Sequence, residues 1–303
     1  MNNNNTPLQP RRRLFRRLEE NLPPLAITER DVSILRLVRD HRFINTEQIH
    51  ALVGGSQHNV TERLSRLFHH GYLDRPAHQR ELRAEGYRVM VYALTPKGAQ
   101  AMAQPSGEPV VVSPHLNEDN RTAKRSYLAH TLMVSQFRVC LELACRARLD
   151  LHLTQWRVSD RPLARVFVGL ERVAVIPDAH FVIEAADGRA AHFFLEADRG
   201  TMSQGRFLSK LQSYWQLRAN TLSNSIPRAF RVLTIAQSKR RMENLLSTAT
   251  DADQRHTGSR MFCFTVETEY SLEDPSAVFG AIWRTPVDSI RRSILDRTGE
   301  AHG

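Results

Sequence analysis

The sequence predicts a mixed α/β protein built from two domains, and three observations lead to this prediction. At 303 residues the chain is long enough for about two domains. Its hydrophobic content of 41% and charged content of 24% are ordinary for a protein that buries a core. Helical spacing of apolar residues dominates the first third of the chain, whereas strand-like and helical stretches alternate in the rest.

The composition indicates a partner of opposite charge. The net charge is +10, which favours a polyanion such as double-stranded DNA. No segment approaches the roughly 20 apolar residues of a membrane helix, and the Asn- and Arg-rich N-terminus lacks the apolar core of a secretory signal. Three cysteines without paired metal spacing, Cys140, Cys145 and Cys263, indicate buried thiols in a reducing compartment. We therefore expect a cytoplasmic protein that does not use a membrane.

The first segment, residues 1–26, is predicted to be a disordered basic arm. It is rich in asparagine, then in arginine, and Pro23-Pro24 lies near its end. Its arginines are Arg11, Arg12, Arg13, Arg16 and Arg17. Two interpretations stay open: a solvated tail, or an arm that contacts phosphate groups.

Residues 27–104 are predicted to hold three helices and a β-hairpin. The helices start near Thr28, Thr46 and Ser56, where a capping residue or a turn precedes apolar residues at helical spacing. A polar loop and the strand Val89–Leu94 follow the third helix. This order, with the sequence GYLDR…YALTPKG, resembles the winged helix-turn-helix regulators, and the resemblance implies a DNA-binding domain.

The third helix of this domain has the two faces of a recognition helix. Val60, Leu64 and Leu67 form an apolar face for the core, and the opposite face is polar and basic. The residues predicted to contact base edges are Gln57, His58, Asn59 and Thr61, and those predicted to contact phosphates are Arg63 and Arg66. The following loop adds Arg80, Arg83 and Arg88. A solvated amphipathic helix and a domain for protein contacts are the alternatives.

Residues 105–119 are predicted to be a linker that separates the two domains. Four spaced residues break any regular element there: Pro105, Gly107, Pro109 and Pro114. A long helix over Arg121–Arg148 then opens the second domain. His130 lies on its apolar face, where a core histidine bonded to backbone is expected more than a ligand.

The second domain, residues 120–284, is organised around a predicted β-hairpin. Two apolar runs, Val173–Ile183 and Ala191–Ala197, flank the turn Ala186-Asp187-Gly188. With this three-residue turn, Asp178 falls opposite Glu196, and Asp198 lies on the same face of the hairpin. A two-residue turn would move Asp178 to the other face.

Three clustered carboxylates repel one another unless a divalent cation or a basic side chain neutralises them. Pro177-Asp178 with Glu196-Ala197-Asp198 resembles the PD-(D/E)xK nucleases, and the resemblance implies a restriction-endonuclease-like fold in which Asp178, Glu196 and Asp198 hold Mg²⁺ or Mn²⁺. The chain departs from the family at Asp198, where lysine is usual. Arg199 or Lys210 would then supply the positive charge, with Lys210 as a further catalytic candidate. The alternative is a set of acids that face solvent at the strand ends.

Alternating elements fill the rest of the second domain. A helix over Arg206–Arg218 carries Lys210 on a face adjacent to its apolar side, where a solvated lysine is expected more than one that reaches the acids. A strand, a helix and a strand then follow, which predicts a parallel pair of strands. Their ranges are Phe230–Ala236, Lys239–Ser247 and Met261–Val266. Residues 285–303 are expected to form a C-terminal tail.

The whole order of elements is similar to the replication-relaxation family of bacterial plasmids and other mobile elements. The resemblance spans about Thr28 to Trp283 and rests on EADRGT at Glu196–Thr201, the Lys210–Tyr214 spacing and the late strand RVLTIA. It implies a DNA-associated role in replication or relaxation of such an element, with a relaxase or replication proteins as partners and an oligomer allowed. A Mg²⁺-dependent endonuclease or nickase and a winged-helix transcriptional regulator are the alternatives.

Overall fold

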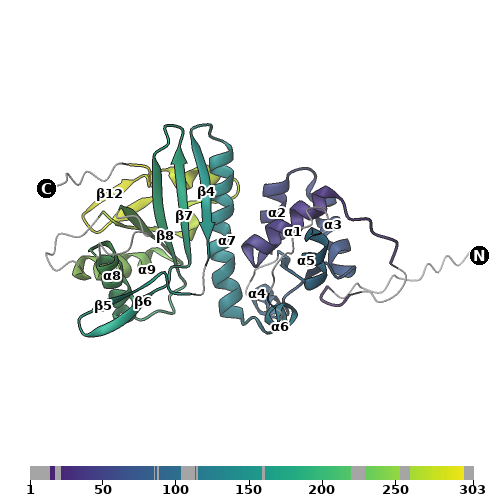
Figure 1. The fold of residues 1–303 in the computed structure, drawn as a ribbon, viewed down its shortest axis with the longest axis horizontal. Coiled ribbons are helices and arrows are strands. Elements are labelled where there is room, and N and C mark those ends of the chain that lie inside the picture. The colour runs from purple at the N-terminus through teal and green to yellow at the C-terminus, as the bar shows by residue number, and fades with distance from the viewer. Residues whose placement is uncertain are drawn as a thin grey trace, which may run out of the picture. The chain divides into compact units, whose positions relative to one another are not determined.

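The protein is a mixed α/β protein, as predicted, and its chain divides into two compact units, Met1–Ala129 and His130–Gly303. The computed structural model describes residues 14–17, 22–84, 86, 89–103, 113, 115–158, 161–219, 229–252 and 260–296. The division falls within the long helix α7 (Arg125–Arg146), which is shown in Figure 1. The predicted linker, residues 105–119, lies largely outside the described residues, and the prediction was wrong at its C-terminal end, where helix α6 begins at Leu116.

The N-terminal unit contains helices around a small antiparallel sheet of strand order β1-β3-β2. Its helices are α1 (Glu29–His41), α2 (Thr46–Val53), α3 (Gln57–His69), α4 (Gln79–Ala84), α5 (Pro96–Ala103) and α6 (Leu116–Thr122). Its strands are β1 (Ile44–Asn45), β2 (Leu73–Asp74) and β3 (Val91–Leu94). Thr28 begins α1 with a capping box, in which the side chain of Asp31 accepts from the backbone of Thr28.

Another prediction for this unit was also wrong: the polar loop between β2 and β3 contains helix α4. The side chain of Gln79 holds this helix against β3. Its amide nitrogen donates to the carbonyl of Val91 at 3.0 Å, and its oxygen accepts from the Val91 amide at 2.9 Å. These two bonds occupy both backbone groups of Val91 and fix α4 against β3.

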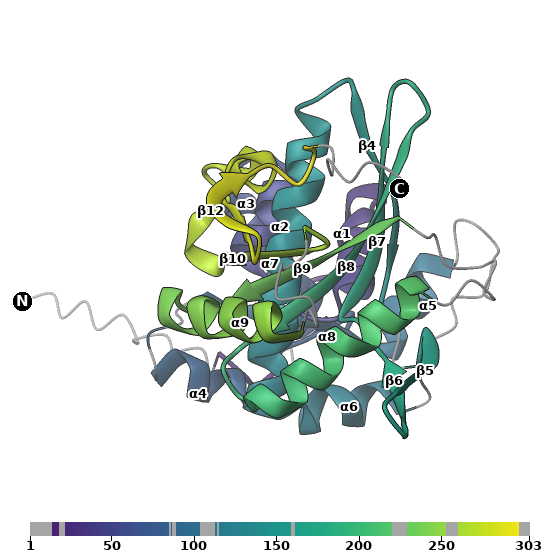
Figure 2. The same ribbon diagram turned by 90° about the vertical axis from the view of Figure 1, so that its left-hand side faces the viewer.

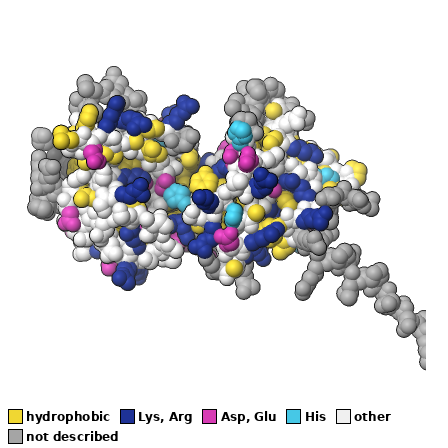
Figure 3. Space-filling view, turned by 90° about the horizontal axis from the view of Figure 1, so that it is seen from below, with side chains coloured by type: hydrophobic (Ala, Val, Ile, Leu, Met, Phe, Trp, Pro, Cys, Tyr) yellow, Lys and Arg dark blue, Asp and Glu magenta, His cyan; other side chains and the backbone are white. Residues whose placement is uncertain are grey.

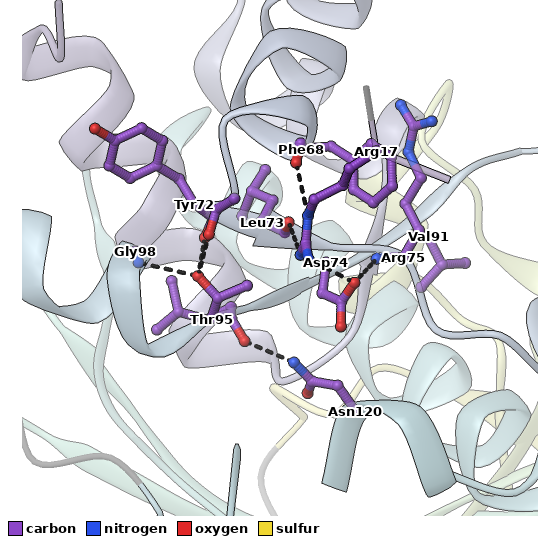
Figure 4. A network of polar contacts seen from close by, with 12 residues as sticks. Arg17, Phe68, Tyr72, Leu73, Asp74, Arg75, Val91, Thr95, Gly98 and Asn120 are labelled. Atoms are coloured by element: carbon purple, nitrogen blue, oxygen red, sulfur yellow. Dashed lines mark hydrogen bonds and ion pairs between the residues drawn. The ribbon is translucent and has the colours of Figure 1, made fainter. Parts of the chain in front are cut away.

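The two halves of the motif GYLDR…YALTPKG are joined by a network of hydrogen bonds around Thr95 (Figure 4). The Thr95 hydroxyl lies 2.7 Å from the carbonyl oxygen of Gly71 and 2.9 Å from that of Tyr72, and it accepts from the Gly98 amide at 3.0 Å. A Cβ on Gly98 would lie only 2.2 Å from the carbonyl oxygen of Tyr72. The glycine therefore lets helix α5 approach the chain that leads into β2.

Part of the predicted basic arm is bound to this unit. Arg17 donates to the carbonyl oxygens of Phe68 and Leu73, each at 3.1 Å, and pairs with Asp74 at 3.3 Å (Figure 4). These contacts attach the segment to the end of α3 and to β2. Residues 1–13 and 18–21, with Arg11, Arg12 and Arg13, lie outside the described residues.

The C-terminal unit is built on a seven-stranded sheet of order β12-β11-β10-β9-β8-β7-β4. Its strands are β4 (Leu151–Arg157), β7 (Ala179–Ala185), β8 (Ala190–Asp198), β9 (Phe230–Ala236), β10 (Phe262–Val266), β11 (Trp283–Thr285) and β12 (Asp288–Arg292). Strand β9 runs parallel to both β8 and β10, which confirms the predicted parallel pair. The remaining neighbours are antiparallel.

Helices cover both faces of this sheet (Figures 1 and 2). On one face α7 packs over Phe181, Ile183, Phe193 and Leu195, the apolar face that the hairpin pattern predicts. On the other face Phe194 and its neighbours pack against α8 (Gln204–Ala219) and α9 (Lys239–Ala252). Two short 3₁₀ helices, Glu267–Glu269 and Pro275–Phe279, connect β10 to β11.

The register of the central hairpin is the predicted one. Ala179 pairs with Leu195, and Ala185 donates to Arg189 at 2.9 Å across the three-residue turn. Gly188 takes a φ of +82°, a conformation that favours glycine. The same register places Asp178 opposite Glu196.

Two other predictions for this unit need correction. The run Val173–Ile183 is two strands, β6 (Glu171–Val175) and β7, because Pro177 between them has no N–H to donate. Strand β6 pairs instead with β5 (Ala164–Val168), which the sequence prediction missed, and the two form a separate hairpin. The expected tail, residues 285–303, contains strand β12, which pairs with β11, and Ile294, which is buried in the core.

The close approach at Gly98 gives a first testable prediction. Gly98→Ala is expected to destabilise the protein by about 2 kcal/mol, because the new methyl group meets backbone that must shift. Gly205→Ala is the matched control. It lies in α8 with open space at its Cβ position, and it should be neutral or stabilising by less than about 1 kcal/mol. Denaturant melts of both variants measure the difference, and equal stabilities would contradict the packing at Tyr72.

Candidate functional site

Glu196 is the buried centre of the candidate site. It lies near the end of β8 with 5% of its surface exposed. One carboxylate oxygen accepts from the Tyr214 hydroxyl at 2.5 Å, and the other accepts from the Lys210 ammonium group. Both donors come from α8, four residues apart, so they lie on one face of that helix. Burial raises the pKa of Glu196 to about 7, although Lys210 opposes the shift.

Lys210 connects all three predicted acids. Burial by itself would lower the pKa of its ammonium group, but the charges of Glu196, Asp178 and Asp198 outweigh this effect and raise it. The side chain is only 21% exposed. Lys210 is therefore not the solvated lysine that the sequence favoured; it reaches the cluster as the ion-pair partner of Glu196.

Asp178 has a different partner, which comes from the opposite layer. Its Oδ1 atom lies 3.1 Å from Nε2 of His130 in α7, and its Oδ2 atom accepts from the Ala197 amide at 2.7 Å. Burial would raise the pKa of Asp178, but the hydrogen bond and charge of His130, with Lys210, hold it below its usual value. The bond to Asp178 in turn raises the pKa of His130. His130 is thus bonded to a carboxylate and not, as expected, to backbone.

Asp198 is paired with an arginine of α9. The Arg241 guanidinium donates to both of its oxygens, at 2.7 and 2.9 Å, and a third donor is the Gly200 amide at 2.8 Å. Arg241 also donates to the carbonyl of Met202 at 2.7 Å. This two-point pair raises the pKa of Arg241 and joins α9 to the end of β8.

These contacts bear on whether the three carboxylates can bind a divalent cation. Each oxygen of Asp178 and Glu196 already accepts from a protein donor, and both oxygens of Asp198 accept from Arg241. Within the described residues no three His, Cys, Asp or Glu side chains surround one point where a metal ion would sit. In this arrangement the three acids are engaged in ion pairs and hydrogen bonds within the protein, and we derive no reaction step through a metal.

The sequence identified the acids but not most of their partners. His130 was placed on the correct helix face, and Tyr214 stood at the correct spacing from Lys210. Arg241 had no signal in the sequence, because it approaches Asp198 only through the packing of α9. Burial raises the pKa of Glu267, and the charge of Arg199, the other candidate for the positive charge, opposes this shift.

The predicted DNA-contacting residues of α3 divide into two groups. Gln57, His58, Asn59 and Thr61 are exposed on its first two turns, while Val60 on the other side is 2% exposed. The Arg63 guanidinium instead binds the buried carboxylate of Asp31 with two hydrogen bonds and donates to the Ala26 carbonyl at 2.8 Å. Arg63 therefore holds α3 to α1, and its guanidinium is not free to contact a phosphate.

The remaining basic candidates lie around α3 and α4. Arg66 is half-buried on α3, Arg83 is half-buried on α4, and Arg80 is exposed with its guanidinium 4.6 Å from the centre of the Phe15 ring. Arg88 lies outside the described residues. Of these candidates, Arg66, Arg80 and Arg83 lie at the surface in the part of the chain that the structure describes.

The comparison with protein families agrees with the order of elements. A family model described as replication-relaxation matches residues 35–233, which include the three acids, Lys210 and Tyr214. The chain belongs to the replication-relaxation family. No curated protein and no solved structure matches this replication-relaxation protein. No helix among the residues that the structure describes is long and apolar enough to cross a membrane.

The buried pair of Glu196 and Lys210 gives a second prediction. Lys210→Met removes the cation, so the pKa of Glu196 should rise further above its usual value of 4.5. A folded-state pKa above the unfolded one means that stability is lost as the pH rises from about 4.5 through the folded-state pKa. We expect Lys210→Met to cost about 3 kcal/mol at pH 8 and clearly less at pH 5.

The double variant Lys210→Met/Glu196→Gln supplies the control for this prediction. It removes both charges and should recover most of the stability at pH 8. Lys239→Met removes an exposed lysine and should change little. Urea melts at the two pH values measure all three variants. A loss in Lys210→Met that does not depend on pH would contradict a charged pair.

Proposed function

We propose that this replication-relaxation protein binds double-stranded DNA and acts in the replication or relaxation of a plasmid or other mobile element. The N-terminal unit serves as a winged helix with α3 as its recognition helix. The observation that carries the proposal is the division of α3 into a buried apolar face and an exposed polar first half. The family and the net charge of +10 support it.

The C-terminal unit then acts as a nuclease-like domain that does not cut. Its three acids are engaged by His130, Lys210 and Arg241, and these pairs account for their burial without a metal. In this function the domain holds DNA or a relaxase or replication protein of the same element in place.

A nuclease or nickase remains a second candidate because of one observation. Asp178 and Glu196 are opposite each other at the end of the hairpin, and Lys210 interacts electrostatically with both. This set of residue types resembles a PD-(D/E)xK site with a lysine supplied by α8.

The proposed recognition helix gives a third prediction. Asn59→Ala should relax sequence preference, because an exposed amide at the start of α3 is placed to contact a base edge. Arg66→Ala should weaken binding to all sequences and lower the salt dependence by about one phosphate contact. Fluorescence anisotropy against duplexes of different sequence, at several salt concentrations, measures both.

A comparison of Arg63→Ala with Arg66→Ala distinguishes the structural role of Arg63 from the proposed phosphate contact of Arg66. Arg63→Ala leaves the buried carboxylate of Asp31 without its partner and should cost about 3 kcal/mol of stability. Arg66→Ala should leave the melting temperature unchanged. If Arg66→Ala and Asn59→Ala both bind like the wild type, α3 is not the recognition helix.

The choice between the two functions of the C-terminal unit gives a fourth prediction. We expect supercoiled DNA to stay intact with the protein in Mg²⁺ or Mn²⁺ as in EDTA, and the melting temperature to be unaffected by the metal. Asp178→Asn should destabilise the protein, because it weakens the bond to His130. Nicking that is lost in Asp178→Asn and Glu196→Gln, together with a metal-dependent rise in the wild-type melting temperature, would establish the second candidate.

A further inference from the structure

The β5–β6 hairpin (Ala164–Val175) is the part of the C-terminal unit that the proposed function does not use. It lies outside the seven-stranded sheet and packs against α8 (Figures 1 and 2). Val166 and Val175 attach it to the core, with 3% and 0% of their surfaces exposed. The Leu163 amide donates to the Val175 carbonyl at 2.8 Å and closes its base. The hairpin is therefore held firmly by its inner face.

The outer face of the hairpin carries a different set of side chains. Alternation along the strands points Arg165, Phe167 and Arg172 away from the valines, and Phe167 pairs directly with Arg172 across the strands. Phe167 is 64% exposed, and Leu170 in the turn is 100% exposed. Burying each such side chain against a partner would be worth about 1.5–3 kcal/mol, so the two residues offer apolar surface for binding.

The two arginines of this face are free to bind a partner. Neither Arg165 nor Arg172 has a hydrogen bond or an ion pair within the described residues, and both are exposed. The acid of the hairpin, Glu171, is in register with Val168 on the inward-facing side. The outer face is thus positively charged and apolar at once. Figure 3 shows that, on the left-hand part of the molecule seen from below, Lys and Arg side chains lie among hydrophobic ones, with a few Asp and Glu side chains between them.

From this combination we propose that the β5–β6 hairpin is a second DNA-binding element, which contacts duplex DNA through its minor groove. Arg165 and Arg172 bind phosphates or enter the groove, where the negative potential attracts arginine. Phe167 and Leu170 insert against a base step and kink the duplex, as apolar side chains of minor-groove proteins do. Charge complementarity selects this partner, since a surface of two unpaired arginines around an apolar tip matches a polyanion with apolar base faces.

This inference rests on the proposed DNA-binding function, but it predicts a different measurement from the α3 variants. Arg165→Ala/Arg172→Ala should remove about two phosphate contacts, which lowers the slope of log affinity against log salt concentration, and should leave sequence preference unchanged. Between about 50 and 200 mM salt the wild type should therefore lose about tenfold more affinity than the variant. The control is Lys239→Ala/Arg240→Ala, which removes the same charge from another exposed site.

The apolar pair has its own readout, which is the shape of the DNA. Phe167→Ala/Leu170→Ala should keep the salt dependence but abolish the bend of a duplex labelled at both ends for energy transfer. Bends of this kind are about 20–90°. Leu149→Ala/Ile290→Ala, at two other exposed apolar positions, should leave the bend intact. The hairpin variants change only exposed side chains, and their melting temperatures should match the wild type.

The experiment measures DNA binding by fluorescence anisotropy and DNA bending by energy transfer. It uses the full-length wild type and these four double variants, with duplex and single-stranded oligonucleotides. Support requires a lower salt dependence for the arginine pair and a lost bend for the apolar pair, each absent from its control. Hairpin variants that behave like their controls overturn this inference alone, and so does an effect confined to single-stranded DNA. A wild-type chain that binds no duplex DNA overturns the proposed function as well.

Discussion

Three carboxyl groups at the end of the central hairpin each need a cation, and this requirement positions the helices around the sheet. The partners of Asp178, Glu196 and Asp198 come from α7, α8 and α9 respectively. Because α7 lies on the opposite face from α8 and α9, the pairs attach both layers to one end of the sheet. A buried charge without its partner costs several kcal/mol, so none of these helices can shift along the strands independently.

The sequence was most informative where local rules and burial agree. The three-residue turn with Gly188 and the alternation of apolar residues are both local properties, and together they determined the register that places Asp178 opposite Glu196. The capping box at Thr28 was likewise predictable from a pattern a few residues long, and the parallel strands β9 and β10 from the order strand, helix, strand.

The rest of the fold depends on contacts between distant residues, which such patterns do not contain. Helix α4 is held in place by the bonds from Gln79 to Val91, and strand β6 ends just before Pro177. The candidate site shows the same limit. Carboxylates could be found by their register, but the cation that meets each of them is selected by helix packing, and Arg241 is 43 residues from Asp198.

The division of arginines between structure and binding follows from the same packing. Arg63 and Arg241 each find a buried carboxylate and are held by two hydrogen bonds, so their charges are neutralised within the fold. Arg165 and Arg172 face solvent on a hairpin whose inner side is already buried. The net charge of +10 therefore does not show which basic side chains are available to DNA and which are neutralised within the fold. The positive surface available to DNA consists of the basic groups that are not paired with buried acids. A count of basic residues treats Arg63 and Arg165 alike, although only Arg165 is exposed to solvent.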